Sequence, residues 1–271
     1  MKEKKGLSMN DLHKFQMALS QVYKEDPCGV LPNALWKTVE TLATLQCSLD
    51  VSLSREILDL RAWDQEGLRV LWNGARETDE AFHQIMTQSR FMIIHDDYFK
   101  QVDCDGYSVT KPFFRIMHDH ESIPASTLSD GFYIKEADPE RESQQMANLI
   151  GKCYRDLHPS PDAVKSWNNH LAFEQSLWIW IIDRSSDAPA ALGIAELDGS
   201  VPEGSLEWIQ VLPEYQGRGL GKALALELLQ RLRGRANFTT VSGEVDNVAN
   251  PERLYRSCGF TGRDVWWLLR K

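Results

Sequence analysis

The chain has 271 residues, 42% of them hydrophobic and 25% charged, which is the composition of a globular protein long enough for two domains. The formal net charge of −9 argues against nucleic acid as a main partner and mildly favours a cationic substrate. Five scattered cysteines indicate neither a disulfide framework nor a zinc site, and no apolar run resembles a membrane span or a secretory segment, so we expect a soluble, reduced, cytoplasmic protein.

Residues 1–125 predict a small α+β domain with its own core. Helices are expected over 12–23 and 35–47, and strands over 56–63, 68–72, 91–94 and 113–117. This part carries no glycine-rich anion loop and no nucleophile arrangement, so no function is assigned to it. The polar stretch 119–130 is the expected linker, which places a second domain over residues 126–271.

The second domain begins with alternating strands and helices. In order, we expect a strand at 132–137, helices at 139–154 and 159–170, strands at 177–182 and 190–197, a loop at 198–204, a strand at 206–211, a helix at 220–232, a strand at 238–245, a short helix around Tyr255 and a strand at 265–269.

A glycine-rich loop joins one of these strands to the helix that follows. Its sequence, Gln216-Gly-Arg-Gly-Leu-Gly-Lys222, removes side chains where backbone N–H groups can approach a ligand. The N-terminus of the following helix points at the same place and favours an anion, most often phosphate. Arg218 and Lys222 add positive charge, so the loop predicts a phosphate-binding site.

Two common phosphate motifs do not fit this loop. A Walker loop needs Ser or Thr after its lysine, and Lys222 is followed by Ala223. A dinucleotide fingerprint needs a different glycine spacing near the start of a βαβ unit. The pattern Gln/Arg-x-x-Gly-x-Gly after Val-x-Pro instead resembles the acetyl-CoA loop of the GNAT superfamily of N-acetyltransferases. An ordinary strand-to-helix turn is the alternative.

A second motif downstream supports the same resemblance. Leu254, Tyr255, Gly259 and Phe260 match the Leu-Tyr-x-x-x-Gly-Phe helix end of the superfamily, and both motifs occur in family order. One departure is that Val248 stands where the family usually has an asparagine. Asn247 and Asn250 flank that position, and either could contact the cofactor; Asn250 is also a natural helix cap.

The resemblance implies a mixed, mostly antiparallel sheet with flanking helices, acetyl-CoA as co-substrate and no metal. Backbone groups of Ile209, Gln210 and Val211 would pair with the pantetheine amides like an added strand. The loop residues Gln216, Gly217, Arg218, Gly219, Leu220, Gly221 and Lys222 would hold the pyrophosphate.

The same resemblance assigns the proton transfers to two side chains. Tyr255 would be the general acid to the leaving sulfur. Glu207 lies four residues before Val211, where several relatives carry a base; it shares a face with Val211 unless a bulge intervenes. A solvent-facing glutamate, a base acting through water, and no protein base at all are the alternatives.

Together these features predict an acetyl-CoA-dependent N-acetyltransferase that moves acetyl to a primary amine, in a small molecule or a peptide, by direct attack in a ternary complex. The alternative is an acyl-CoA-binding sensor without turnover. We expect no nucleic acid or membrane partner, and a homodimer is compatible with the sequence. The N-terminal part is either a degenerate second GNAT copy or an unrelated accessory domain. The segment His118-Asp-His-Glu121 could ligate a metal, but no third ligand is evident and a solvated strand end is favoured.

Overall fold

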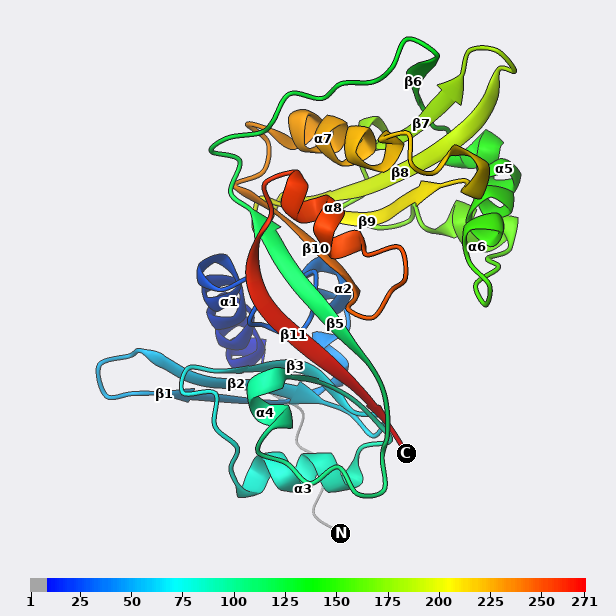
Figure 1. Ribbon diagram of the computed structural model, residues 1–271. Coiled ribbons are helices and arrows are strands. Elements are labelled where there is room, and N and C mark those ends of the chain that lie inside the picture. Colours follow the sequence, from blue (N-terminus) through cyan, green and yellow to red (C-terminus); the bar gives the residue numbers. More distant parts are fainter. Residues whose placement is uncertain (1–8) are drawn as a thin grey trace. The chain divides into compact units, whose positions relative to one another are not determined.

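The fold is described for residues 9–271 from a computed structural model of the chain (Figure 1). These residues form two compact units. Unit 1 holds the described residues up to Ile116 together with Ser242–Asn250 and Gly262–Lys271, and unit 2 holds Met117–Val241 and Pro251–Thr261. The chain therefore passes from one unit to the other more than once. None of the helices in the described part of the chain is long and apolar enough to cross a membrane.

Unit 1 contains two sets of strands. Its elements are α1 (Met9–Glu25), α2 (Trp36–Val39), the 3-10 helix η1 (Leu42–Thr44), β1 (Gln46–Val51), β2 (Ile57–Trp63), β3 (Leu68–Asn73), α3 (Glu80–Gln88), β4 (Phe91–His95), α4 (Asp96–Phe99), most of β5 (Ser108–His118) and most of β11 (Thr261–Arg270). Strands β1, β2 and β3 form one antiparallel sheet. Strand β11 pairs antiparallel with β4, from Trp266 opposite His95 to Arg270 opposite Phe91.

The helix predicted over residues 35–47 is wrong. The segment instead divides into α2, η1 and the start of β1. Threonine hydroxyls explain the break, because Thr41 Oγ1 donates to the carbonyl of Thr38 at 2.9 Å and Thr44 Oγ1 to that of Thr41 at 2.7 Å. Such local bonds compete with a continuous helix, and β-branched residues favour extended structure.

Unit 2 contains a mixed, mostly antiparallel sheet. Its elements are β6 (Phe132–Glu136), α5 (Pro139–Cys153), α6 (Pro161–Ser166), the 3-10 helix η2 (Gln175–Leu177), β7 (Trp178–Asp183), β8 (Ala188–Asp198), β9 (Glu203–Val211), the 3-10 helix η3 (Pro213–Tyr215), α7 (Leu220–Leu232), the first part of β10 (Phe238–Glu244) and α8 (Pro251–Ser257). The strand order is β10-β9-β8-β7-β6, with only β10 and β9 parallel. The predicted fold class is confirmed.

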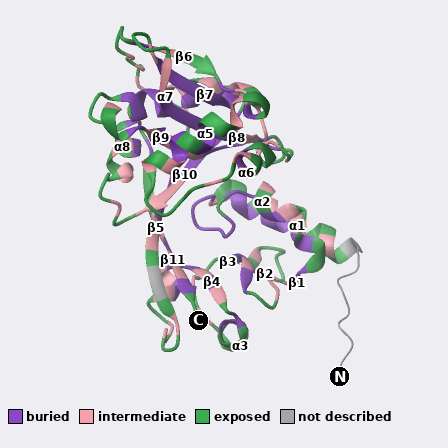
Figure 2. Cartoon of the chain, turned by 90° about the vertical axis from the view of Figure 1, so that its right-hand side faces the viewer, coloured by how far each residue is buried: buried purple, intermediate pink, exposed green. Residues whose placement is uncertain are grey.

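Two helices cover opposite faces of this sheet. Helix α5 places Met146, Leu149 and Ile150 in a core cluster with Leu192 of β8. Gly193, the next residue, faces α7 instead, where a Cβ would lie 3.1 Å from Leu224. Because neighbouring strand residues point to opposite faces, α5 and α7 lie on opposite sides of the sheet. Figure 2 shows the central strands of unit 2 as largely buried.

The predicted domain boundary at residue 125 does not coincide with the two units. The first crossing, in β5, lies close to the expected linker, and residues 119–131 form no helix or strand. However, Gly262–Lys271 belongs to unit 1, because β11 forms its hydrogen bonds with β4. A single cut in the sequence therefore does not separate the compact units, and the division of function between the two parts stays a prediction.

Candidate functional site

The glycine-rich loop connects η3 to α7 on the surface of unit 2. Gly217 and Gly219 have φ of 77° and 80°, in the left-handed region that favours glycine, and a Cβ at either position would meet nothing within 4 Å. Gly219 is the N-cap residue of α7, so no side chain caps the helix there. The first N–H groups of a helix have no intrahelical partner. They are therefore directed toward an exposed, side-chain-free surface that can bind an anion.

Gly221 has a different role from the other two glycines. It is buried in the first turn of α7, and a Cβ there would lie 2.8 Å from Leu254 Cδ1 on α8. This glycine allows α7 and α8 to approach each other, rather than opening backbone to a ligand. The sequence could not separate the two roles, because all three glycines recur at a spacing of two.

The charged residues of the loop are exposed, and one is held by its neighbours. The Arg218 guanidinium lies 5.2 Å from the ring centre of Tyr215, a cation–π distance. The Tyr215 hydroxyl donates to Asp183 Oδ2 at 2.9 Å, which fixes the ring. Lys222 is exposed on the first turn of α7. Both cations lie within or next to the loop, and their contact with phosphate stays a prediction.

Strand β9 offers a backbone edge next to the loop. Its parallel pairing with β10 extends only from Glu203 to Leu206, whereas its antiparallel pairing with β8 continues to Val211. Ile209, Gln210 and Val211 consequently pair on one side only among the described strands. The carbonyl of Val211 accepts from Gln216 Nε2 at 3.4 Å. An extended ligand could add to this edge through main-chain hydrogen bonds.

Tyr255 lies on α8 and is almost fully buried. Its ring packs edge-to-face on Phe260, with ring centres 5.7 Å apart. Burial raises the pKa of Tyr255 well above its usual value, and nearby Tyr154 and Cys258 add to the increase. Tyr154, at the end of α5, accepts a hydrogen bond from Gln210 Nε2 at 2.8 Å. Tyr255 therefore keeps its proton at neutral pH, as a general acid must.

A β-bulge changes the expected position of Glu207. Trp208 is opposite Ile194 and Leu206 is opposite Ala195, so Glu207 is the extra residue of a β-bulge. It therefore does not continue the simple alternation through Ile209 and Val211. The prediction that Glu207 shares a face with Val211 applied only to a strand without a bulge, and β9 has one. The role of Glu207 as the base stays a prediction.

Glu196 on β8 is a residue that sequence reasoning missed. It is 3% exposed, and Oε2 is buried without a hydrogen-bond partner among the described residues. Burial raises the pKa of Glu196 to about 7, and the Glu207 carboxylate raises it further, while His170 opposes the increase. His170 Nε2 lies 3.6 Å from Oε1. A glutamate inside the apolar run 190–197 was the signal that could have identified it.

Two further sequence predictions concern the asparagines beside Val248 and the possible metal ligands at 118–121. Asn247 and Asn250 belong to unit 1 and the loop to unit 2, so which of them contacts the cofactor stays a prediction. In the segment proposed as an alternative metal site, His120 Nε2 lies 2.6 Å from Thr239 Oγ1. Across residues 9–271 there is no group of three or more His, Cys, Asp or Glu side chains suited to a metal ion.

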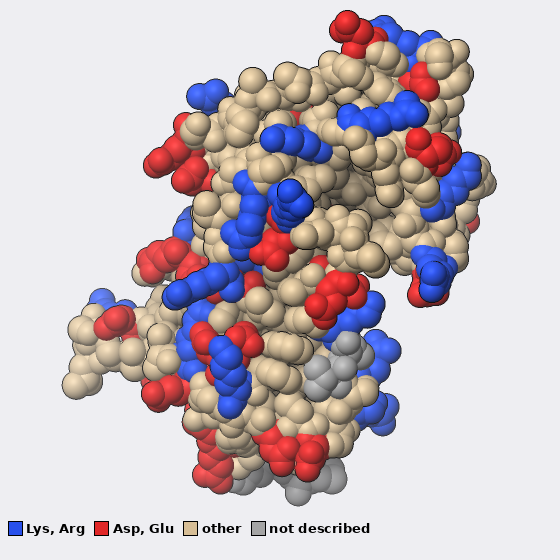
Figure 3. Space-filling model, viewed as in Figure 1, with Lys and Arg blue, Asp and Glu red and all other residues tan. Residues whose placement is uncertain are grey.

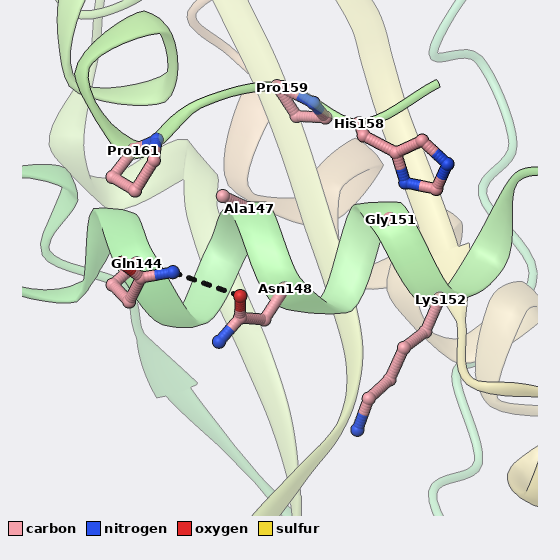
Figure 4. A pocket seen from close by; sticks show the side chains of 8 residues that line it. All are labelled: Gln144, Ala147, Asn148, Gly151, Lys152, His158, Pro159 and Pro161. Carbon is pink, nitrogen blue, oxygen red and sulfur yellow. Dashed lines mark hydrogen bonds between the residues drawn. The ribbon is translucent and has the colours of Figure 1, made fainter. Parts of the chain in front are cut away.

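A separate cavity of about 370 Å³ lies against α5 (Figure 4). It is lined by Gln144, Ala147, Asn148, Gly151, Lys152, His158, Pro159 and Pro161. Gln144 Nε2 donates to Asn148 Oδ1 at 2.9 Å along its edge. None of the residues predicted for cofactor binding or catalysis lines this cavity, so it does not belong to the site built above.

The charged side chains give little guidance to the acceptor. Figure 3 shows Lys and Arg interspersed with Asp and Glu on the face that it presents, so the net charge of −9 is not concentrated there in one patch. The preference for a cationic substrate stays a prediction.

Comparison with known proteins identifies the family of one part of the chain. Residues 143–260 match the family described as Acetyltransferase (GNAT) family, so the chain carries a GNAT acetyltransferase domain. That family uses acetyl-CoA. A mycothiol acetyltransferase of Thermomonospora curvata is 31% identical over 156 residues, which are 51% of this chain and 47% of that protein. The chain thus matches about half the length of this curated relative.

Solved structures extend the similarity in fold to nearly the whole chain. A GCN5-related N-acetyltransferase from Sphaerobacter thermophilus has a TM-score of 0.66 at 14% identity, over 96% of this chain and 93% of that one. A tandem GNAT protein from the clavulanic acid biosynthesis pathway has a TM-score of 0.58 at 13% identity, over 98% and 96%. At these identities the likeness concerns the fold alone. Whether the N-terminal part is a degenerate second GNAT copy or an unrelated accessory domain stays a prediction.

Proposed function

We propose that this protein is an acetyl-CoA-dependent N-acetyltransferase that transfers acetyl to a primary amine by direct attack in a ternary complex. The observation that carries the proposal is the exposed loop at Gly217 and Gly219, which ends on an uncapped helix N-terminus beside the half-paired end of β9. This combination fits a phosphorylated ligand with an extended amide-bearing arm.

The residues of the chain have distinct tasks in this reaction. Acetyl-CoA, when bound, supplies the acetyl group as an activated thioester. The loop N–H groups and Arg218 bind phosphate, and the free edge of β9 pairs with amide groups. Glu207 removes a proton from the acceptor ammonium, since only a neutral amine is a nucleophile. Tyr255 holds the proton that the departing sulfur needs.

We propose the chemical class of the acceptor and not the individual compound. A primary amine that is cationic before reaction is favoured by two carboxyl groups, Glu207 and Glu196, on the strands that carry the cofactor edge. Because one relative is named a mycothiol acetyltransferase, the acceptor of that relative belongs in any substrate panel.

The test is an acetylation assay on the full chain. The protein is incubated with acetyl-CoA and a panel of small-molecule and peptide amines, and release of the CoA thiol is followed. We expect turnover with at least one amine and a roughly 10²-fold lower kcat for Tyr255→Phe at unchanged acetyl-CoA affinity. CoA binding without turnover on any amine would favour a sensor module, and absence of CoA binding would refute both functions.

A further inference from the structure

A group of buried polar atoms lies on one face of β8 and β9. Glu196 and Ser205 are directly opposite each other in the ladder and are 3% and 4% exposed. Glu196 Oε2 and Ser205 Oγ are buried without a hydrogen-bond partner among residues 9–271. A buried polar atom without a hydrogen bond destabilises the fold, and the Trp178 indole, which lowers the pKa of Glu196, is a donor on the same face.

The bulge in β9 brings a second carboxyl group toward this face. Ser205 and Trp208 face the same side of the sheet as Glu196 and Ile194, because opposite residues in a ladder share a face. The extra residue between them is Glu207. Glu207 thus lies in the ladder between Ser205 and Trp208, next to the position of Glu196, and its carboxylate raises the pKa of Glu196.

His170 completes the arrangement on the other side of Glu196. Its Nε2 lies 3.6 Å from Glu196 Oε1, and its side chain is 16% exposed. The neighbouring backbone is fixed to β8, since the Leu197 N–H donates to the Ala172 carbonyl at 2.8 Å. His170 thus connects a buried carboxyl group to solvent. The groups facing Glu196 are His170 from the loop after α6, Glu207 and Ser205 from β9, and Trp178 from β7.

We propose that Glu207, Glu196 and His170 form a proton route that leads from the acceptor amine to solvent. The proposal rests on the N-acetyltransferase function proposed above and adds two positioning residues to it. Glu207 is the member that meets the acceptor, and Glu196 and His170 act through it.

The proton balance is simple. An N–H bond of the acceptor ammonium breaks, its electron pair stays on nitrogen, and an O–H bond forms on Glu207. The proton then passes to the Glu196 carboxylate, which regenerates ionised Glu207. It leaves from Glu196 to a ring nitrogen of His170 and from there to solvent. No oxidant, reductant or further co-reactant is required. The buried carboxyl is well matched to this task, because its pKa of about 7 lies near the working pH.

The first test compares pH profiles of kcat for the wild type and Glu196→Gln. In the wild type, kcat should fall as the pH drops through about 7, because Glu196 must be ionised to accept the proton. In Glu196→Gln we expect kcat at pH 8 to fall about tenfold and this inflection to disappear. Glu196→Asp keeps a titratable group and should retain an inflection, shifted in pH. Profiles that overlay the wild type would overturn the route.

The second test uses chemical rescue of His170. His170→Ala should slow turnover, and added imidazole should restore it by carrying protons to solvent. His83→Ala, on α3 of unit 1, is the matched control and should neither slow turnover nor respond to imidazole. A His170→Ala variant that is as fast as the wild type, or that imidazole does not restore, would overturn the route.

A third measurement separates this inference from the proposed function. The infrared carbonyl band of protonated Glu196 should titrate with a midpoint near 7 in the absence of substrate and should be missing in Glu196→Gln. If the band titrates but no amine is acetylated, the proposed function fails and the route fails with it. If amines are acetylated and no such band exists, only the route fails.

Discussion

Single glycines in the loop differ in what they do, although they look alike in the sequence. Gly219 has a left-handed φ and open space around it, whereas Gly221 is packed against Leu254. The sequence correctly predicted a glycine-rich strand-to-helix connection, and helix α7 begins and ends where the periodicity placed it. It could not indicate which glycine faces a ligand, since that depends on where α8 packs.

We predict that Gly219→Asp weakens CoA binding by at least tenfold, because a carboxylate would stand at the helix N-terminus that receives the phosphate. Gly219→Asn is the matched control, since asparagine has the same shape and also tolerates a left-handed φ. Calorimetric titration with CoA checks the prediction. Equal affinities for the two variants would show that charge at this position is irrelevant.

We also predict a pH-dependent stability change for Glu196→Gln. The folded pKa of about 7 is above the unfolded value, so the folded protein binds more protons between about pH 4.5 and 7. Wild-type stability is therefore lost as the pH rises through this window, and Glu196→Gln avoids that loss. Its free energy of unfolding relative to the wild type should rise by up to about 3 kcal/mol between pH 4.5 and 8.

Urea unfolding at both pH values provides the measurement. A constant difference between the two proteins would show that Glu196 does not titrate in this range. The only local signal for this group was a glutamate inside the apolar run 190–197, because strand alternation alone does not show that β9 bulges or that His170 lies beside β8. Both facts are tertiary, and they depend on the register of β8 and β9.

At the scale of elements, the contact between α7 and α8 positions Tyr255. Gly221 on α7 meets Leu254 on α8, the residue just before the proposed acid. Elements with strong local signals were predicted well: α5 begins at Pro139 after the capping Asp138, and β7 and β8 are long apolar runs. Helix α3 and strand β1 were missed, because α3 is only nine residues long and β1 is largely exposed.

We predict that Gly221→Val destabilises the fold by roughly 1–3 kcal/mol and lowers kcat, because the added methyl groups push on Leu254 and shift α8. Gly221→Val combined with Leu254→Ala should recover part of the stability, since the shortened side chain makes room. Denaturant unfolding of both single variants and the double variant measures the coupling. Strictly additive effects would mean that the two residues do not interact.

At the scale of the whole molecule, the C-terminal residues belong to the N-terminal unit. On β11, Asp264 Oδ1 lies 3.0 Å from His95 Nε2, and Trp266 Nε1 donates to the Cys28 carbonyl at 2.9 Å. Strand patterns predicted β4 and β11 separately, but pairing between residues so far apart in sequence leaves no local signal. This is why a single linear domain boundary was the natural reading of the sequence.

We predict that a fragment of residues 126–271 is poorly soluble, because β11 would lose its β4 partner and expose Trp266, which is 5% exposed in the full chain. A fragment of residues 117–261 is the matched control, since it keeps all of unit 2 and omits most of β11. It should be the more soluble of the two and should retain CoA binding. Size-exclusion chromatography and CoA titration decide between them, and equal behaviour would contradict the prediction.

The pairing of β11 with β4 also has a consequence for synthesis of the chain on the ribosome. His95 on β4 pairs with Trp266 on β11, so about 170 residues must be translated after His95 before that ladder can form. At roughly 5–20 residues per second, the nascent β4 stays unpaired with β11 for on the order of ten seconds or more. The elements of unit 2 emerge during this interval. A chaperone that shields exposed strands during translation should therefore raise the yield of this protein more than one that acts after release.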